Sequence, residues 1–189
     1  MTTRNGGYKM TKPKIASDWM AGCAGCHMSL LDMDERIIKI AELADLRATP
    51  ITDLKEPDES GVDVGVLEGG INNTANEEVA HRMRERSKIL VALGDCAVFG
   101  GVPALRNFCG IQEALQRAYV EAESVDESGK IPSDPELATM TKVRAVHEVV
   151  PVDVFVPGCP PDADVIYTVL SELAQGRMPE LKDELLHWH

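Results

Sequence analysis

The stretch Lys88-Ile89-Leu90-Val91-Ala92-Leu93-Gly94-Asp95-Cys96 decides the fold. From Ile89 to Leu93 every residue is apolar, with no polar alternation, which predicts a strand that is covered on both faces. Strands of this kind belong to parallel sheets with helices on either side. A glycine, an acid and a thiol follow at once, so the predicted strand ends on residues suited to a turn and to chemistry.

Strand and helix patterns alternate along the rest of the chain. Further strands are predicted at 14–20, 48–54, 62–70 and 152–156, and helices at 30–46, 74–87, 110–120 and 162–174. For the helix at 74–87 the pattern offers Asn72, Asn73 or Thr74 as the N-cap residue. The alternation predicts a flavodoxin-like, doubly wound α/β fold. Its mainly parallel five-stranded sheet would have the order 2-1-3-4-5 and carry helices on both faces.

The length of 189 residues leaves room for one ordinary domain. We expect that domain at residues 14–176, between a flexible N-terminal arm at 1–13 and a surface tail at 177–189. Residues 121–142 contain several proline, glycine, serine and aspartate residues, so we expect a long excursion there rather than a core element.

Composition narrows the possible functions. The formal net charge is −12 and only 4% of the residues are aromatic, which disfavours nucleic acid and anionic membranes as partners. No apolar run approaches the length of a membrane helix, and Met1 to Lys14 lacks the apolar core of a signal peptide. We therefore expect a cytoplasmic protein, in which an odd set of five cysteines indicates metal or redox chemistry rather than disulfides.

Four of the cysteines follow predicted strands. Cys23 and Cys26 lie just after the first strand, Cys96 follows the fourth, and Cys159 follows the last within a Pro-Gly-Cys-Pro-Pro sequence. Because the carboxyl ends of parallel strands meet at one edge of a sheet, we expect these thiolates to lie together and to hold one iron–sulfur cluster. Local zinc motifs usually supply their ligands in close pairs, and here only the first pair is close.

Other interpretations of these residues stay open. The Cys23-x-x-Cys26 spacing alone also suits a redox pair or half of a zinc site, so a zinc-stabilised interaction module is an alternative. A flavin mononucleotide carrier would suit the fold, but the sequence shows no clear phosphate loop. We expect Cys109 to be a buried non-ligand and His27 a surface or interface residue. Glu68 is either a solvated strand-end acid or a group beside the thiols that could relay protons, and we find no other candidate catalytic residue.

The motifs together resemble those of the small subunits of nickel–iron hydrogenases and of the related cluster-bearing subunit of respiratory complex I. The resemblance extends over Ile15 to about Ala174 and rests on the first cysteine pair after Trp19, on Leu67-Glu68-Gly69-Gly70, on Gly94-Asp95-Cys96-Ala97-Val98-Phe99-Gly100-Gly101 and on Pro157-Gly158-Cys159-Pro160-Pro161. It implies that Cys23, Cys26, Cys96 and Cys159 bind the proximal [4Fe–4S] cluster, beside the nickel–iron site of a separate large subunit.

Departures from the family pattern narrow the expectation. The complex I subunit carries adjacent cysteines where this chain has Gly25-Cys26, and we find neither the twin-arginine leader nor the second cluster domain of respiratory hydrogenases. The chain looks most similar to small subunits of soluble NAD-reducing hydrogenases, which are H2:NAD+ oxidoreductases. Their diaphorase subunits carry flavin mononucleotide and further iron–sulfur clusters. A hydrogenase that uses another acceptor, such as coenzyme F420, is the alternative.

Overall fold

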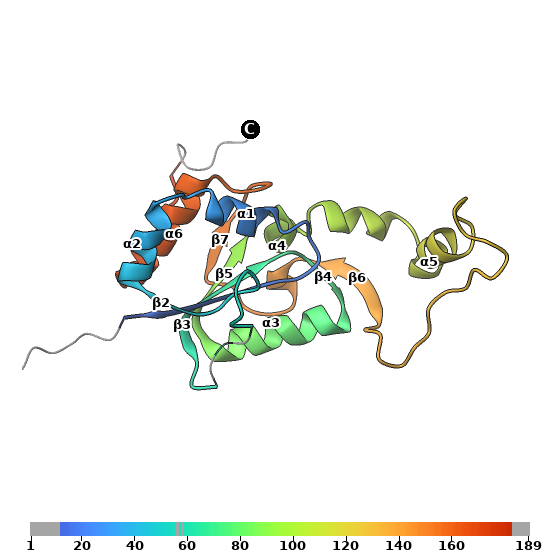
Figure 1. The fold of residues 1–189 in the computed structure, drawn as a ribbon, viewed down its shortest axis with the longest axis horizontal. Coiled ribbons are helices and arrows are strands. Elements are labelled where there is room, and N and C mark those ends of the chain that lie inside the picture. The colour runs from blue at the N-terminus through green and yellow to red at the C-terminus, as the bar shows by residue number, and fades with distance from the viewer. Residues whose placement is uncertain (1–11, 56, 58, 183–189) are drawn as a thin grey trace, which may run out of the picture.

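A computed structural model describes residues 12–55, 57 and 59–182. Its centre is a parallel five-stranded sheet, in the order β2-β1-β3-β5-β7, which is 2-1-3-4-5 when only these strands are counted (Figure 1). The strands are β1 (Lys14–Trp19), β2 (Asp45–Ala48), β3 (Val62–Glu68), β5 (Ser87–Leu93) and β7 (Val154–Val156). The predicted flavodoxin-like fold is confirmed.

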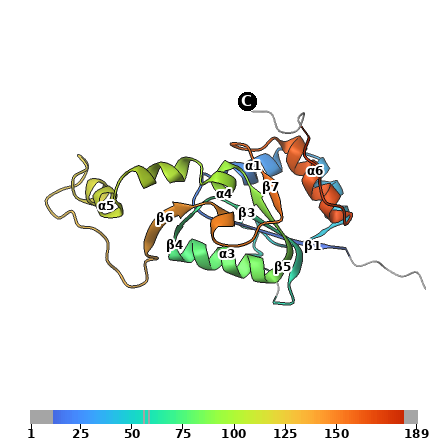
Figure 2. The same cartoon turned by 180° about the vertical axis from the view of Figure 1, so that it is seen from behind.

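Helices cover both faces of this sheet, as the apolar central strands require. On one face lie α1 (Gly25–Leu31), α2 (Arg36–Leu43) and α6 (Ala163–Ala174), and on the other lies α3 (Thr74–Arg86), as Figures 1 and 2 show. Val91 and Leu93 of β5 point into the first of the two cores, and Leu90 and Ala92 into the second. The central strand is therefore buried on both sides.

The register of the sheet brings the carboxyl ends of four strands level. Trp19 of β1 pairs with Glu68 of β3, Glu68 pairs with Leu93 of β5, and Leu93 pairs with Val156 of β7. The segments that follow these four residues therefore leave the sheet at the same edge, and they carry the cysteines.

Two predicted elements have different bounds in the structure. The single helix expected at 30–46 is wrong: α1 and α2 are separated by a turn in which Asp34 adopts a left-handed conformation with φ of 51°. Aspartate tolerates that conformation better than most residues, and it interrupts the helical path between α1 and α2. The second strand, expected at 48–54, instead spans Asp45–Ala48, because Pro50 lacks the N–H that a ladder needs.

A projecting arm follows β5. It comprises α4 (Asp95–Phe99), the 3₁₀ helix η1 (Val102–Phe108) and α5 (Ile111–Tyr119), and it extends away from the sheet (Figure 1). Neither α4 nor η1 was expected. The expected excursion at 121–142 is irregular over most of its length, but its end joins β6 (Met140–Arg144), which pairs antiparallel with β4 (Ile71–Asn73).

The remaining segments add little to the site. A short 3₁₀ helix, η2 (Val146–Glu148), leads from β6 towards β7. Most of the expected N-terminal arm, and residues 183–189 of the expected tail, lie outside the described residues. Within the part of the chain that is described, no helix has both the length and the apolar character needed to cross a membrane.

Candidate iron–sulfur site

The four predicted cysteines line one small cavity at the carboxyl edge of the sheet. Cys23, Cys26, Cys96 and Cys159 surround a space of about 60 Å³ together with Glu68. Among the described residues, no three His, Cys, Asp or Glu side chains are arranged to hold a single metal ion. The topology thus brings together residues separated by more than a hundred positions in the chain.

Backbone geometry makes room for the sulfur atoms. Gly94 has φ of 84° and ψ of 160°, a conformation that is essentially reserved for glycine. A Cβ atom at this position would overlap Sγ of Cys26. Gly101, with φ of 49°, packs in the same way against Cys96, where an added Cβ would lie 2.9 Å from Sγ. The glycines after β5 therefore allow the thiols of two different loops to enter the cavity.

Asp95 ties two of the cysteine loops together. Its backbone N–H donates to the Gly158 carbonyl at 2.8 Å, and its carboxylate accepts from the Gly158 N–H at 2.7 Å. This reciprocal pair joins the loop of Cys96 to the loop of Cys159 across 63 residues of sequence. Asp95 was not among the residues predicted from the sequence, although its place between the strand-ending glycine and the cysteine could have indicated the role.

Glu68 anchors the loop of Cys23 and Cys26 through hydrogen bonds on its buried side. Its carboxylate accepts the backbone N–H groups of Cys26 at 3.3 Å and of His27 at 2.9 Å, and it also bonds Nδ1 of the His27 ring. Nε2 of His27 lies 3.0 Å from the Ser17 hydroxyl, which in turn donates to Thr49. Glu68 is only 2% exposed and His27 is fully buried. These side chains form a hydrogen-bonded chain through the base of the site.

Two expectations about single residues were wrong. His27 is buried rather than at the surface, because Glu68 and Ser17 satisfy both of its ring nitrogens and Trp19 packs against its edge at 5.5 Å. Cys109 is exposed rather than buried, since it follows the projecting helix η1. It does not line the cavity, and its expected role as a non-ligand stays a prediction.

The charge environment of the cavity favours cations. Burial raises the pKa of the Cys26 thiol far above its usual value, and the nearby Glu68 carboxylate and the other three cysteines raise it further. Burial also raises the pKa of Cys96, against a hydrogen bond from the backbone N–H of Val102 that lowers it. The Cys26 and Cys96 thiols therefore lose their protons more readily when positive charge enters the cavity. Iron supplies such charge, so the donor set and the space left by the glycines fit an iron–sulfur cluster.

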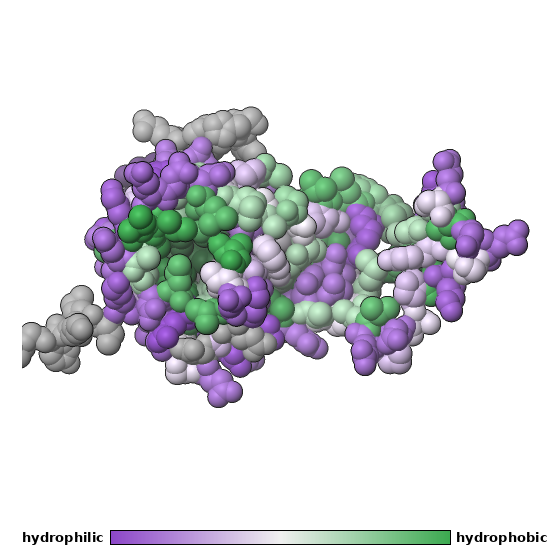
Figure 3. All heavy atoms as spheres, viewed as in Figure 1, coloured by the Kyte–Doolittle hydropathy of each residue, from purple (hydrophilic) through white to green (hydrophobic). Residues whose placement is uncertain are grey.

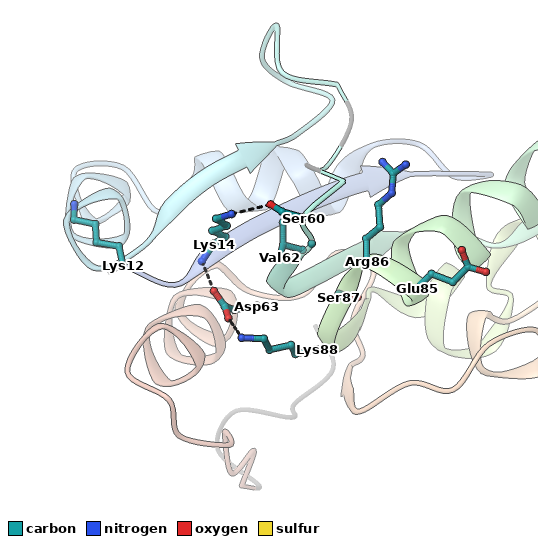
Figure 4. A pocket seen from close by; sticks show the side chains of 10 residues that line it. Lys12, Lys14, Ser60, Val62, Asp63, Glu85, Arg86, Ser87 and Lys88 are labelled. Atoms are coloured by element: carbon teal, nitrogen blue, oxygen red, sulfur yellow. Dashed lines mark hydrogen bonds and ion pairs between the residues drawn. The ribbon is translucent and has the colours of Figure 1, made fainter. Parts of the chain in front are cut away.

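A wider pocket lies at the opposite ends of the same strands (Figure 4). There Asp63 accepts from the Lys14 backbone N–H and from the Lys88 ammonium group, and the Lys14 ammonium group donates to Ser60. Burial alone would raise the pKa of Asp63, but its lysine partners hold it below the ordinary value. The charged groups of this pocket lie at the start of the strands, away from the cysteine cavity.

Comparison with known proteins places the chain in a family. Residues 23–173 match the family described as NADH ubiquinone oxidoreductase, 20 Kd subunit. The chain is 40% identical to the delta subunit of the NAD-reducing hydrogenase HoxS of Cupriavidus necator, over 92% of this chain and 84% of that protein. It is also 40% identical to a subunit of the F420-non-reducing hydrogenase of Methanothermobacter marburgensis, over 90% of this chain but only 56% of the length of that relative.

One solved structure supports the same assignment, and another shares the fold. A subunit in a crystal structure of an NAD+-reducing [NiFe]-hydrogenase superposes with a TM-score of 0.89 at 38% identity, covering 94% of this chain and 99% of that one. A chain of the Desulfomicrobium baculatum Ni-Fe-Se hydrogenase, at 21% identity and a TM-score of 0.54, shares the fold. The chain therefore belongs to the NADH ubiquinone oxidoreductase 20 Kd subunit family and, within it, to the iron–sulfur, electron-transferring small subunits of nickel–iron hydrogenases.

Proposed function

We propose that this chain is the electron-transfer small subunit of a cytoplasmic NAD-reducing nickel–iron hydrogenase. Cys23, Cys26, Cys96 and Cys159 would bind one [4Fe–4S] cluster, proximal to the nickel–iron site of a separate large subunit. Diaphorase subunits with flavin mononucleotide and further clusters would pass the electrons on to NAD+. The observation that carries this proposal is the single cavity lined by the four thiols at the carboxyl edge of the sheet.

The residues of this chain have defined tasks in the proposal. When bound, the cluster supplies one-electron redox chemistry. Gly94 and Gly101 let the sulfur atoms approach, and the Val102 N–H donates to Cys96, a type of bond that tunes a cluster's potential. Glu68, which is buried, accepts the backbone N–H of Cys26 and so fixes the position of that residue in the loop. The chain itself would carry electrons and perform no hydrogen splitting.

The identity of the electron acceptor is a more specific proposal than the role of the chain as a small subunit. The likeness to the NAD+-reducing [NiFe]-hydrogenase subunit, with its TM-score of 0.89 over nearly the whole of both chains, favours NAD+. A second candidate is the small subunit of a hydrogenase with another acceptor, and the equal 40% identity to an F420-non-reducing hydrogenase subunit favours it. Both candidates use the same cysteines.

Purification of the tagged chain with its natural subunits tests the proposal. We expect four irons and four acid-labile sulfides per chain in addition to those of the partners, as a [4Fe–4S] cluster requires. Cys96→Ser or Cys159→Ser should abolish H2-dependent reduction of NAD+ and lower the iron and sulfide content. Cys109→Ser is the matched control, because this exposed thiol lies outside the cavity.

Each outcome has a clear meaning. A Cys96→Ser protein that keeps its full iron and its activity would refute the ligand assignment. Zinc in place of iron, with no labile sulfide, would instead identify a zinc-stabilised module. Hydrogen oxidation without NADH formation, in a complex that lacks a flavin-containing partner, would favour the second candidate.

A further inference from the structure

Of the four cysteines that line the cavity, Cys159 receives the least support from the sheet. It follows β7, a strand of three residues that forms an edge of the sheet and, within the described part of the chain, pairs with β5 alone. The strands β1 and β5, which precede the other three cysteines, have a neighbour on both sides. Cys159 and the following Pro160 are also exposed. Loops in such a place are ordinarily mobile, so other contacts are needed to keep this thiol at the cavity.

Asp95 fastens the loop on the amino-terminal side of Cys159. Its carboxylate accepts the backbone N–H of Gly158 at 2.7 Å, and its own N–H donates to the Gly158 carbonyl at 2.8 Å. The Gly94 N–H adds a bond to the Val156 carbonyl at 2.7 Å. Two of these three bonds join backbone to backbone, whereas the third depends on the side chain of Asp95. A substitution at Asp95 therefore removes a single contact between the two loops.

Ser29 fastens the loop on the carboxyl-terminal side of Cys159. Its hydroxyl group donates to the Pro161 carbonyl at 2.6 Å, across 132 residues of sequence. Ser29 is only 6% exposed and Pro161 is buried. Loss of the hydroxyl group would therefore leave a buried acceptor without its partner.

The two fastened residues of the loop lie against each other. Gly158 has φ of 136°, and a Cβ atom at this position would lie 2.5 Å from Cα of Pro161. Only Cys159 and Pro160 stand between them in the sequence. The loop is thus a narrow turn with Cys159 at its tip, and its two ends are attached to different parts of the protein.

The Cys96 loop has supports of its own. It continues into the projecting arm, where η1 carries hydrophobic side chains at the surface between α4 and α5 (Figure 3). The side-chain amide of Asn107 bonds the N–H and the carbonyl of Val143 at 2.8 and 2.9 Å, which ties η1 to β6. Cys96 can therefore keep its place without the Cys159 loop and can serve as a support for it.

We propose that Asp95 and Ser29 are positioning residues that keep the Cys159 thiolate bound to the cluster. The proposal rests on the proposed function, since it concerns a cluster held by the four cysteines. Asp95 directly precedes Cys96, and Ser29 follows Cys26 by three residues on α1. Each fastening therefore joins the Cys159 loop to a segment that carries another thiol. When either bond is removed, Cys159 is the ligand that leaves first.

Alkylation of individual cysteines tests this order. The complex, purified through a tag on this chain, is treated with iodoacetamide and an iron(II) chelator, and mass spectrometry follows the initial rate at which each cysteine is modified. In Asp95→Ala and in Ser29→Ala the rate at Cys159 should rise by about tenfold or more, because a hydrogen bond of this kind changes an equilibrium by about that factor. The rates at Cys26 and Cys96 should stay at the wild-type values.

Two matched variants separate positioning from a general loss of stability. Asp95→Asn keeps an oxygen that can accept the Gly158 N–H and should restore the slow rate at Cys159. Ser87→Ala removes a hydroxyl group that is equally buried, at 7% exposure, and that donates to the Met83 carbonyl at 2.5 Å. Because Ser87 begins β5, at the opposite end from the cavity, this variant should keep the wild-type rates.

The outcomes distinguish this proposal from the proposed function. Selective reaction of Cys159 in both alanine variants supports the positioning role. Wild-type rates at Cys159 in these variants, an equal rise at all four cysteines, or an Asp95→Asn protein that reacts as fast as Asp95→Ala would overturn it. A wild-type complex in which this chain holds no iron and its four thiols all react freely would instead refute the proposed function.

Discussion

Gly94→Ala is the substitution that most directly tests how the backbone shapes the cavity. The backbone at Gly94, with φ of 84° and ψ of 160°, costs an alanine about 1–3 kcal/mol. The added Cβ would lie under 3.0 Å from Sγ of Cys26, against an ordinary contact of about 3.5–4.0 Å, so the thiol must move by at least about 0.5 Å. Overpacking adds about 1–3 kcal/mol, which gives a destabilisation of about 4 kcal/mol in all.

The displacement matters more for metal binding than for folding. Ligand positions in a metal site tolerate shifts of only about 0.2 Å, so the Cys26 thiol would leave its place in the cavity. We therefore expect Gly94→Ala to lower the iron and sulfide content as well as the free energy of unfolding in urea. Gly176→Ala is the control, because Gly176 also has positive φ, at 76°, but nothing lies within 4 Å of an added Cβ. Equal stability and equal iron content in the two variants would refute the reasoning.

Three further predictions concern single polar groups. Glu68→Ala leaves the buried N–H groups of the first cysteine loop without an acceptor and should lower the unfolding free energy in urea by about 2 kcal/mol or more; an unchanged midpoint would contradict this. Asn73→Ala removes the N-cap of α3 and should cost about 1 kcal/mol in thermal unfolding. Burial would raise the pKa of Asp153, but bonds from Leu90 and Arg84 lower it overall. The stability that Asp153 contributes is therefore present above its unfolded pKa of about 3.9 and is lost as the pH falls through its lower folded pKa. In the Asp153→Asn variant the free energy of unfolding should therefore depend less on pH in this range.

The periodicity of apolar residues and the positions of the cysteines were the main basis for predicting the fold and the site from the sequence. The uninterrupted apolar run from Ile89 to Leu93 indicated a strand buried on both faces, and the alternation of strands and helices indicated the parallel sheet and its order, both of which the structure confirms. Short-range signals were weaker. The break at Asp34 and the early end of β2 at Ala48 depend on single residues whose local preferences compete with the wider pattern.

The amino-acid sequence by itself determined the order of the five parallel strands, which loops carry thiols, and hence at which edge of the sheet the thiols lie, because these follow from local pattern and from the single direction of parallel strands. Only the tertiary structure decided that His27 is buried against Glu68, that Asp95 joins two cysteine loops, and that η1 turns its apolar face outward. Each of these depends on burial or on contacts between residues distant in the chain, which local sequence patterns do not specify.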